Sequence, residues 1–453
     1  MSVELNPAHR ASQGMRPTIN WLHAAISSST ASLEKFVQPH VRPLAELAER
    51  RTRKIEIILA VMTVGYIIAA IYYYWQAVYL ARGYPHNTFL CVPWERFTDY
   101  DNMILMCRNL NPYHDHSRSS YPPLGSLYYY PFSKLSIQTG FAVFVAIPVL
   151  FLVLIIAWVL KSTPRFYRWA TIVALLFSYP FLFAVDRGNS ELWIMMSLGV
   201  FFLLYSSPKP WLRDVSGLAL AIAIAFKFYP APLLLISFKD RRYLDCAKTV
   251  LLAGLLTLFA AAFFQGGAAK ALHDFREVLS ATAEWAKDSV KHGANNLGVF
   301  YAVMIVLKKM NLESTSQVFM EKFWMLSLML LGGYSLLIAK AQLSLWASAT
   351  CLVILACLVP SISYDYRMVQ LLVPLLLMLT VRTPCTAWHA VICILFGLLL
   401  VPKNYWLLFP EIPPGDVGIA SVINPLLLFV LLNVILFSEG AFKLQLRHRV
   451  PVN

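Results

Sequence analysis

The chain alternates long apolar runs with short polar segments that are rich in turn residues. Two runs, residues 55–80 and 139–160, each have about the 20 residues that a helix needs to cross a bilayer. This pattern predicts an all-α, polytopic helical membrane protein. The further apolar runs expected to cross the membrane are 169–185, 190–205, 249–265, 323–338, 343–358, 368–380, 387–400 and 420–437.

Segment 215–238 is apolar as well, but cations flank it on both sides. Arg213 precedes it and the basic run 239–242 follows it, so a single crossing would leave one cationic group outside. Two prolines near its centre would interrupt a helix, because each lacks a donor and clashes with the preceding turn. We therefore predict a re-entrant hairpin of two half-helices that enters and leaves from the cytoplasm, with Lys227 near its tip.

The composition agrees with a membrane protein, since 58% of the residues are hydrophobic and 14% are charged, with a mean hydropathy of +0.60. The net charge is +14, and the positions of the cations along the chain indicate which segments face the cytoplasm. The basic cluster 50–54, directly before the first span, should stay in the cytoplasm. Both termini are then cytoplasmic, as segments 1–54 and 439–453, and the transmembrane domain 55–438 has roughly eleven to thirteen membrane elements. The expected extracytoplasmic parts are the outer loop 81–138 and the outer segment 266–307.

The sequence also limits the partners, cofactors and covalent links that can be expected. No basic patch alternates with aromatic residues, so nucleic acid is not an expected partner, and no glycine-rich loop suited to a nucleotide phosphate follows a strand.

His114-Asp115-His116 has the residue types of a metal site, but three adjacent ligands cannot easily face one ion, so we expect no metal and no cofactor, with a divalent metal left open. Cys91 and Cys107 could form a disulfide in an oxidising compartment, and two free thiols are the alternative.

Polar side chains from several segments converge on the side away from the cytoplasm. An ionisable residue at membrane depth is costly unless it is paired or solvated, so Lys227 is a functional candidate. A cation there, with Arg187 or Arg367 nearby, suits the phosphate of a polyprenyl-phosphate lipid, whose tail needs the bilayer. The alternative is a snorkelling side chain or a structural ion pair with Asp186. The other converging residues are Asp99, Asp101, Asn189, Tyr364 and Asp365.

A carboxylate close to such a phosphate site could act as a general base that takes the proton from an acceptor hydroxyl. Asp99 is the first candidate, because it lies in the outer loop just before the apolar segment 103–110. Asp101 and Glu95 compete with it, and each of these carboxylates could instead be an ordinary surface charge.

A series of short motifs in this order resembles glycosyltransferase family 87, which consists of membrane enzymes of the GT-C superfamily that use polyprenol-phosphate sugars, mycobacterial mannosyltransferases among them. The likeness covers residues 89–242 well and the later spans weakly, through Asn295-Asn296 and 361–367. The motifs are Phe97-Thr98-Asp99-Tyr100, Leu110-Asn111-Pro112-Tyr113, Ser120-Tyr121-Pro122-Pro123-Leu124, Asp186-Arg187-Gly188-Asn189 and Gly217-Leu218 running into Lys227-Phe228-Tyr229-Pro230.

The resemblance implies a GT-C-type bundle, an outward-facing active site, an inverting transfer and an aspartate base in the first outer loop, which matches Asp99, with Asp101 as the alternative. It also places Tyr121 and Tyr229 with the cations as candidate substrate-binding residues. The implied location is the plasma (inner) membrane of a bacterium.

Together these features predict transfer of a sugar, mannose or another hexose, from a polyprenyl-phosphate donor to a lipid or polysaccharide acceptor outside the cytoplasm. A transporter or flippase of lipid-linked sugars is the competing function. It would use Lys227 as a translocation site with water access from both sides, whereas the enzyme requires a one-sided cavity capped by the first outer loop.

Overall fold

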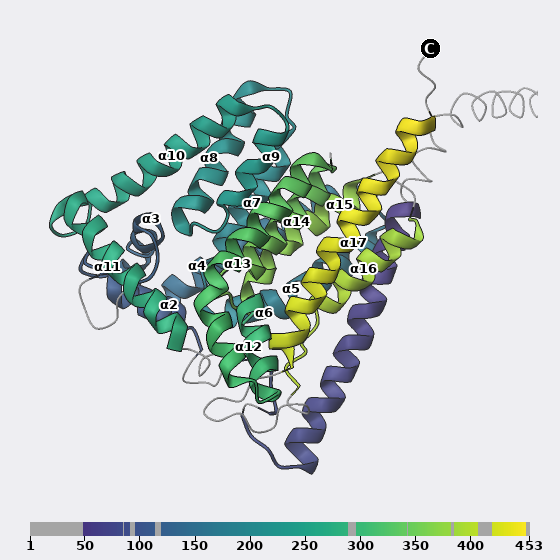
Figure 1. The fold of residues 1–453 in the computed structure, drawn as a ribbon, viewed down its shortest axis with the longest axis horizontal. Helices are drawn as coiled ribbons and strands as arrows, with labels where there is room; N and C mark the ends of the chain where they lie inside the picture. The colour runs from purple at the N-terminus through teal and green to yellow at the C-terminus, as the bar shows by residue number, and fades with distance from the viewer. Residues whose placement is uncertain are drawn as a thin grey trace, which may run out of the picture.

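The computed structural model describes residues 49–84, 86–90, 96–113, 119–288, 296–341, 343–381, 385–405 and 419–449. Within these ranges the chain is a bundle of helices without strands, and one isolated bridge joins Asn296 to Tyr364 (Figure 1). The prediction of an all-α polytopic membrane protein is confirmed. Five helices in the described ranges are long and apolar enough to cross a bilayer: Glu49–Tyr79, α4 (Ile137–Val159), α10 (Tyr243–Ala262), Val318–Lys340 of α13 (Glu313–Lys340) and Ala420–Glu439 of α17 (Ala420–Arg449).

Shorter apolar helices fill the space between these spans. The predicted span 169–185 is broken into α5 (Arg165–Leu176) and α6 (Tyr179–Arg187), which meet at an angle of 45°. The break occurs because Ser178 is extended and Pro180 begins a new helix in its first turn, where a missing N–H costs nothing. The other short helices are α7 (Glu191–Tyr205), α14 (Leu345–Leu358), α15 (Leu372–Thr380) and α16 (Ala387–Leu399). The number of elements that enter the membrane stays a prediction.

The chain turns back on itself at Lys227. α8 (Pro210–Phe226) ends there in an extended residue, and a 3₁₀ turn, Ala231–Leu233, leads into α9 (Leu234–Lys239). At the far end of α9, the Tyr205 hydroxyl donates to Asp240 at 2.8 Å, so the chain has returned to the end of α7, close to the start of α8. The chain thus turns back at Lys227, but the arms are unequal: α8 has 17 residues, about 25 Å, and is longer than the predicted half-helix, whereas α9 has six. The entry of both arms from the cytoplasm stays a prediction.

The described part of the loop 81–138 packs into a small core with the start of α4. The helices α2 (Thr98–Cys107) and α3 (Pro123–Leu127) pack with the start of α4 around Tyr100, Tyr129 and Phe144, each of which is fully buried. The Cys107 thiol is free and buried, and it donates to the carbonyl oxygen of Ser126 at 2.9 Å. Cys91 lies outside the described residues, as do the first 48 residues.

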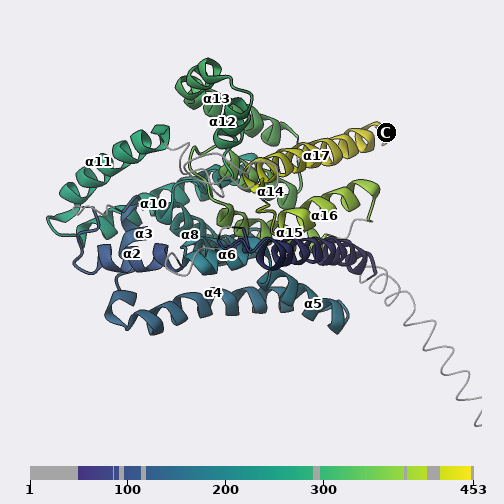
Figure 2. The same cartoon turned by 90° about the horizontal axis from the view of Figure 1, so that it is seen from below.

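The amphipathic stretch that follows α10 forms the helix α11 (Gly267–Asp288), beside α2 and α3 at one edge of the bundle (Figure 1). Phe275 of α11 packs against Tyr113 of the loop 81–138, with ring centroids 5.4 Å apart. The next helix, α12 (Val299–Lys309), is about half a bilayer long. α12 and α13 stand together on the face of the molecule opposite α4 and α5 (Figure 2).

A tight turn between α6 and α7 brings several polar residues close together. Gly188 ends α6 with a φ of 64°, a left-handed conformation that glycine adopts without a steric penalty. The Asn189 N–H then donates to Ala184 O at 3.0 Å, and α7 starts at Glu191. The side chains of Arg187, Asn189 and Glu191 are thereby placed within one turn of chain.

Replacing Gly188 with alanine should destabilise the protein. A Cβ atom there would lie 2.6 Å from the Cβ of Tyr100, and the positive φ adds about 1–2 kcal/mol of strain. We expect Gly188→Ala to lower the unfolding temperature in detergent measurably. Gly254→Ala in α10 is the matched control, because nothing lies within 4 Å of its Cβ position, and it should leave that temperature unchanged or raised. Equal unfolding temperatures for the two variants would contradict this account of the turn.

Candidate active site

Asp99 lies in the first turn of α2 and is held by the last residue of α6, Arg187, and by Asn189 from the turn that follows. Arg187 Nη2 lies 2.5 Å from its Oδ1, and Asn189 Nδ2 donates to its Oδ2 at 2.7 Å. Asp186 anchors the start of α2, because its carbonyl accepts the Phe97 N–H at 2.7 Å. The sequence-predicted residues Asp99, Arg187 and Asn189 are thus in direct contact.

The amide of Asn189 connects this carboxylate to the predicted cation. Its Oδ1 accepts from Lys227 Nζ at 3.2 Å and from the Glu191 N–H at 3.1 Å, while its Nδ2 also lies 3.3 Å from the Tyr121 hydroxyl. The side chain is fully buried, so these partners set which end of the amide faces which charge. Asn189 therefore faces Asp99 with its donor end and Lys227 with its acceptor end.

Lys227 is paired with a carboxylate that the sequence did not suggest. Its Nζ lies 2.9 Å from Glu191 Oε1, and only 11% of its side chain is exposed. The ammonium also lies 4.5 Å from the centroid of the Tyr121 ring, a cation–π contact. The sequence had also allowed a structural ion pair between Lys227 and Asp186. That pairing was wrong, because Lys227 pairs with Glu191 and Asp186 contacts Arg96 at 3.5 Å. Two of the three Lys227 N–H groups are used by Asn189 and Glu191.

Glu191 is the centre of the buried part of the site and is fully inaccessible to solvent. Its Oε2 accepts hydrogen bonds from the Tyr229 hydroxyl and from Gln370 Nε2. Sequence reasoning missed both Glu191 and Gln370. Glu191 begins an apolar helix, where an acidic side chain is explained by its favourable interaction with the helix dipole. However, a buried lysine needs an anionic partner, and this requirement could have pointed to Glu191.

Arg367 also contacts Glu191 and Tyr229, and it donates hydrogen bonds to backbone oxygens. Its Nε is 3.8 Å from Glu191 Oε1, and its guanidinium carbon is 4.2 Å from the Tyr229 ring centroid. Its terminal nitrogens donate to the backbone oxygens of Ala356 and Ile362, at 3.2 and 3.4 Å. These bonds hold the end of α14 against the site.

The remaining candidates lie apart from this cluster. Asp101 is two positions after Asp99 on α2, and residues so spaced do not share a helix face. Its buried Oδ1 has no hydrogen-bond partner, and burial raises the pKa of this carboxyl. Asp365 is buried elsewhere and accepts from the Tyr179 hydroxyl at 2.6 Å. Glu95 and His114-Asp115-His116 lie outside the described residues; within those residues, no group of three His, Cys, Asp or Glu side chains could hold a metal ion.

Asn296 joins the start of α12 to the segment 363–364. Its side-chain Oδ1 accepts from the N–H groups of Gly298 and Ser363, at 2.8 and 3.3 Å, and its backbone forms the bridge to Tyr364. Burial raises the pKa of the Tyr364 phenol to about 12, and the charge of Asp99 acts in the same direction. Asn296 thus ties the start of α12 to the segment that contains Tyr364.

The contacts form one row from Arg187 through Asp99, Asn189 and Lys227 to Glu191, with Arg367 at its end. The five charged groups in this row are three cations and two carboxylates, so one positive charge is in excess. Such a set favours a monoanionic ligand, and a phosphodiester is one. Beside it, Asp99 has lone pairs left to accept a proton, because each carboxylate oxygen has more than one acceptor position.

The comparison with protein families agrees with this chemistry. The model of glycosyltransferase family 87 matches residues 120–361, more than half of the chain. The chain belongs to glycosyltransferase family 87. This membership makes the protein a membrane glycosyltransferase. The matched segment contains Arg187, Asn189, Glu191 and Lys227, whereas Asp99 precedes it. No curated protein and no solved structure matches the chain.

The buried Lys227–Glu191 pair should contribute to stability as a unit. Lys227→Met or Glu191→Gln alone leaves an uncompensated charge in the bundle, and each should lower the free energy of unfolding by about 3–5 kcal/mol. The double variant should lose less than the sum of the two, as measured by unfolding in detergent. Lys248 and Asp214 form a control pair at the same 2.9 Å separation but about half exposed, so Lys248→Met should cost at most about 1 kcal/mol. Additive effects at Lys227 and Glu191 would contradict the coupling.

Proposed function

We propose that this family 87 enzyme transfers a hexose, mannose or another, from a polyprenyl-phosphate donor to a hydroxyl of a lipid or glycan acceptor. The observation that carries the proposal is the row of contacts that joins the carboxylate of Asp99 to a cluster with one excess positive charge. A sugar bound to a lipid through a phosphodiester has one negative charge. Its phosphate can therefore bind at Lys227 while its sugar lies near Asp99.

An apolar groove beside the cluster suits the lipid part of such a donor. It has a volume of about 650 Å³ and lies between α9, α10, α13 and α14. Tyr229 is part of its wall and also bonds to Glu191 at the centre of the charged cluster. An isoprenoid tail in the groove would add about 25 cal/mol for each Å² of apolar surface buried. The apolar side chains that line it include Phe228, Leu234, Leu235, Phe238 and Leu331.

In the proposed reaction Asp99 acts as the general base. Its carboxylate accepts the proton of the acceptor hydroxyl while the hydroxyl oxygen bonds to the anomeric carbon of the sugar. The bond from that carbon to the phosphate oxygen breaks, and the electron pair leaves with the lipid phosphate. The leaving phosphate gains negative charge, which the third N–H of Lys227 and the guanidinium of Arg187 can stabilise. A single displacement of this kind inverts the anomeric centre.

The proposed location of the site is the extracytoplasmic face of a bacterial plasma membrane, with both termini in the cytoplasm. The support is the distribution of cations: the basic cluster 50–54 belongs to the end of the first helix that lies away from the outer loop. Arg51 of this cluster bonds to Val159 O at the corresponding end of α4. Nucleotide sugars are cytoplasmic, so a lipid-linked donor also fits this sidedness.

The base assignment can be tested by amide substitutions. Asp99→Asn keeps the side-chain volume but removes the basicity, so turnover should fall by about 10²-fold or more while lipid-phosphate binding survives. Asp101→Asn is the matched control on the same helix and should keep near-normal turnover. Transfer rates and polyprenyl-phosphate binding would be measured for both variants in nanodiscs. If Asp101→Asn lost turnover and Asp99→Asn kept it, the base would be Asp101.

The donor can be identified with purified protein in lipid nanodiscs. The enzyme should transfer sugar from a polyprenyl-phosphate sugar and ignore the matching nucleotide sugar, because the tail supplies binding energy in the Tyr229 groove. Lys227→Ala should weaken binding of the lipid phosphate. Robust transfer from a nucleotide sugar without any polyprenyl carrier would refute the proposed donor. Transport of a lipid-linked sugar without any transfer would favour the transporter function instead.

A further inference from the structure

The carboxylate of Asp365 is fully buried and lies outside the row of contacts at the active site. Asp365 begins the 3₁₀ helix η6 (Asp365–Leu371), and its Oδ2 accepts from the Tyr179 hydroxyl at 2.6 Å. Its Oδ1 has no hydrogen-bond partner among the residues that the structure describes. Burial of a carboxylate is costly unless other groups compensate its charge. Packing alone therefore does not account for this side chain.

The bond from the Tyr179 hydroxyl joins α6 to η6, and both segments reach the active site. Tyr179 is the first residue of α6, and Arg187, whose guanidinium holds Asp99, is the last. η6 carries Gln370, which donates from Nε2 to the Glu191 carboxylate. The bond thus connects the helix that orients the proposed base with the segment that surrounds the partner of the buried lysine.

Aromatic rings continue this contact along the two segments. The Tyr179 ring stacks on Phe183, one turn further along α6, with centroids 5.7 Å apart and an interplanar angle of 11°. The ring of Phe183 in turn lies 5.8 Å from the ring of Tyr366 in η6. The Lys227 ammonium is 5.9 Å from the centroid of that same Tyr366 ring. A displacement of η6 along α6 would therefore also move an aromatic neighbour of the cation.

Lys403, which follows α16, brings a positive charge to the Asp365 carboxylate. Its ammonium donates to the backbone oxygens of Leu398 and Val401, and 8% of the residue is exposed. Burial raises the pKa of Asp365 to about 6, whereas the Tyr179 bond and the charge of Lys403 act in the opposite direction. Burial lowers the pKa of Lys403 to about 7, so this ammonium is still charged where Asp365 titrates.

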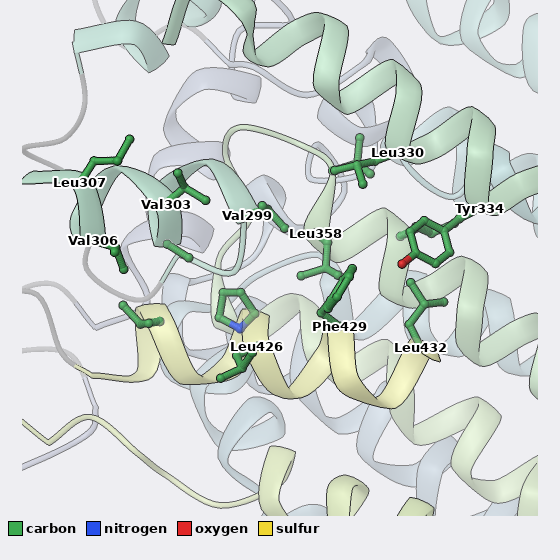
Figure 3. Close-up of a pocket in the computed structure, with 15 residues that line it drawn as sticks. Val299, Val303, Val306, Leu307, Leu330, Tyr334, Leu358, Leu426, Phe429 and Leu432 are labelled. Carbon is green, nitrogen blue, oxygen red and sulfur yellow. The ribbon is translucent and has the colours of Figure 1, made fainter. Parts of the chain in front are cut away.

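Asn424 of α17 approaches the same carboxyl. It is fully buried, neither of its side-chain polar atoms has a hydrogen-bond partner among the described residues, and it too lowers the pKa of Asp365. Leu426 and Phe429 of α17 point instead into an apolar pocket of about 400 Å³ beside α12, α13 and α14 (Figure 3). Asn424 is thus the neutral neighbour of Asp365 on another face of α17. The titratable groups that face Asp365 from neighbouring elements are Tyr179, Lys403 and the Cys357 thiol of α14.

We propose that Asp365 is a positioning residue, which holds η6 against α6 through the Tyr179 hydroxyl and thereby sets the spacing between the Asp99 and Glu191 groups. The proposal rests on the proposed function, because Asp365 acts on sugar transfer only through these two groups. A hydrogen bond to an ionised carboxylate is stronger than one to its neutral form. Protonation of Asp365 therefore loosens the contact, and turnover falls as the pH is lowered.

The test measures kcat with a polyprenyl-phosphate sugar in nanodiscs as a function of pH. The unsubstituted enzyme should lose turnover as the pH falls through about 6. Asp365→Asn keeps an oxygen that accepts from the Tyr179 hydroxyl but does not titrate, so its kcat should be lower by about fivefold and lack this acidic decline. Lys403→Met should move the decline to higher pH, because it removes a charge that lowers the pKa of Asp365.

Asp240→Asn is the matched control. Asp240 accepts from the Tyr205 hydroxyl at 2.8 Å in the same way, but it is exposed and lies at the far end of α9. This variant should keep the kcat and the pH profile of the unsubstituted enzyme. Since both substitutions remove one carboxylate that is bonded to a tyrosine, a difference between them reports on the position of Asp365.

Four results would overturn the inference while leaving the proposed function intact. These are an unsubstituted enzyme without the acidic decline, an unchanged profile in Asp365→Asn, an unshifted decline in Lys403→Met, and equal effects of Asp365→Asn and Asp240→Asn. Tyr179→Phe decides the matter if a variant does not fold, because it removes the bond but neither charge. It should lower kcat and move the decline to higher pH, and wild-type behaviour would refute the inference. Failure of the unsubstituted enzyme to transfer sugar from the polyprenyl-phosphate donor at any pH would refute the proposed function itself.

Discussion

The contact between the Lys227 ammonium and the Glu191 carboxylate is the constraint on which the rest of the site depends. Neither charge could remain inside an apolar bundle alone, because the effective cost of desolvating one ion is several kcal/mol. Lys227 comes from the break between α8 and α9, and Glu191 from the start of α7. Gln370 and Tyr229 complete the shell of the carboxylate. Three separate segments, which are the break after α8, the start of α7 and the 3₁₀ segment Asp365–Leu371, must therefore be in register before both charges are satisfied.

This arrangement explains why the helices near the site are short. α8 ends at Lys227 and α7 begins at Glu191, so backbone groups and charged side chains meet inside the protein and not in lipid. Irregular backbone is tolerated at such depth only where neighbouring groups satisfy it. The long helices α4, α10, α13 and α17 surround these ends, and they expose large apolar side chains such as Trp324 and Leu251.

Much of the fold could be predicted because hydrophobicity and charge act locally. The spans, the interruption near Lys227 and the polar turn after α6 are all visible as composition changes along the chain. The partners of the charges could not be predicted in the same way, because they depend on which helix ends meet in space. Lys227 was recognised as a buried cation, yet its partner Glu191 is 36 positions away in sequence.

Helix geometry separates the first candidate for the base, Asp99, from its alternative, Asp101. The two residues are only two positions apart, and of the two it is Asp99 that lies against Arg187. Arg367 was expected as a phosphate ligand, and in the structure each of its two terminal nitrogens donates to a backbone carbonyl, of Ala356 and of Ile362. The contact of Asp99 with Arg187 depends on the direction in which α2 points each side chain, and the bonds of Arg367 depend on which backbone carbonyls lie near it. Residue types alone specify neither.

The planar amide of Asn189 has a consequence for the order of events at the site. A substrate phosphate that attracts the Lys227 ammonium also draws it away from Asn189 Oδ1, and the same rigid plane carries the Nδ2 that orients Asp99. The loss of one bond changes the polarisation of the other, since hydrogen bonds in a chain strengthen each other. In the proposed reaction, binding of the donor phosphate at Lys227 would therefore act on the Asp99 carboxylate through the side chain of Asn189.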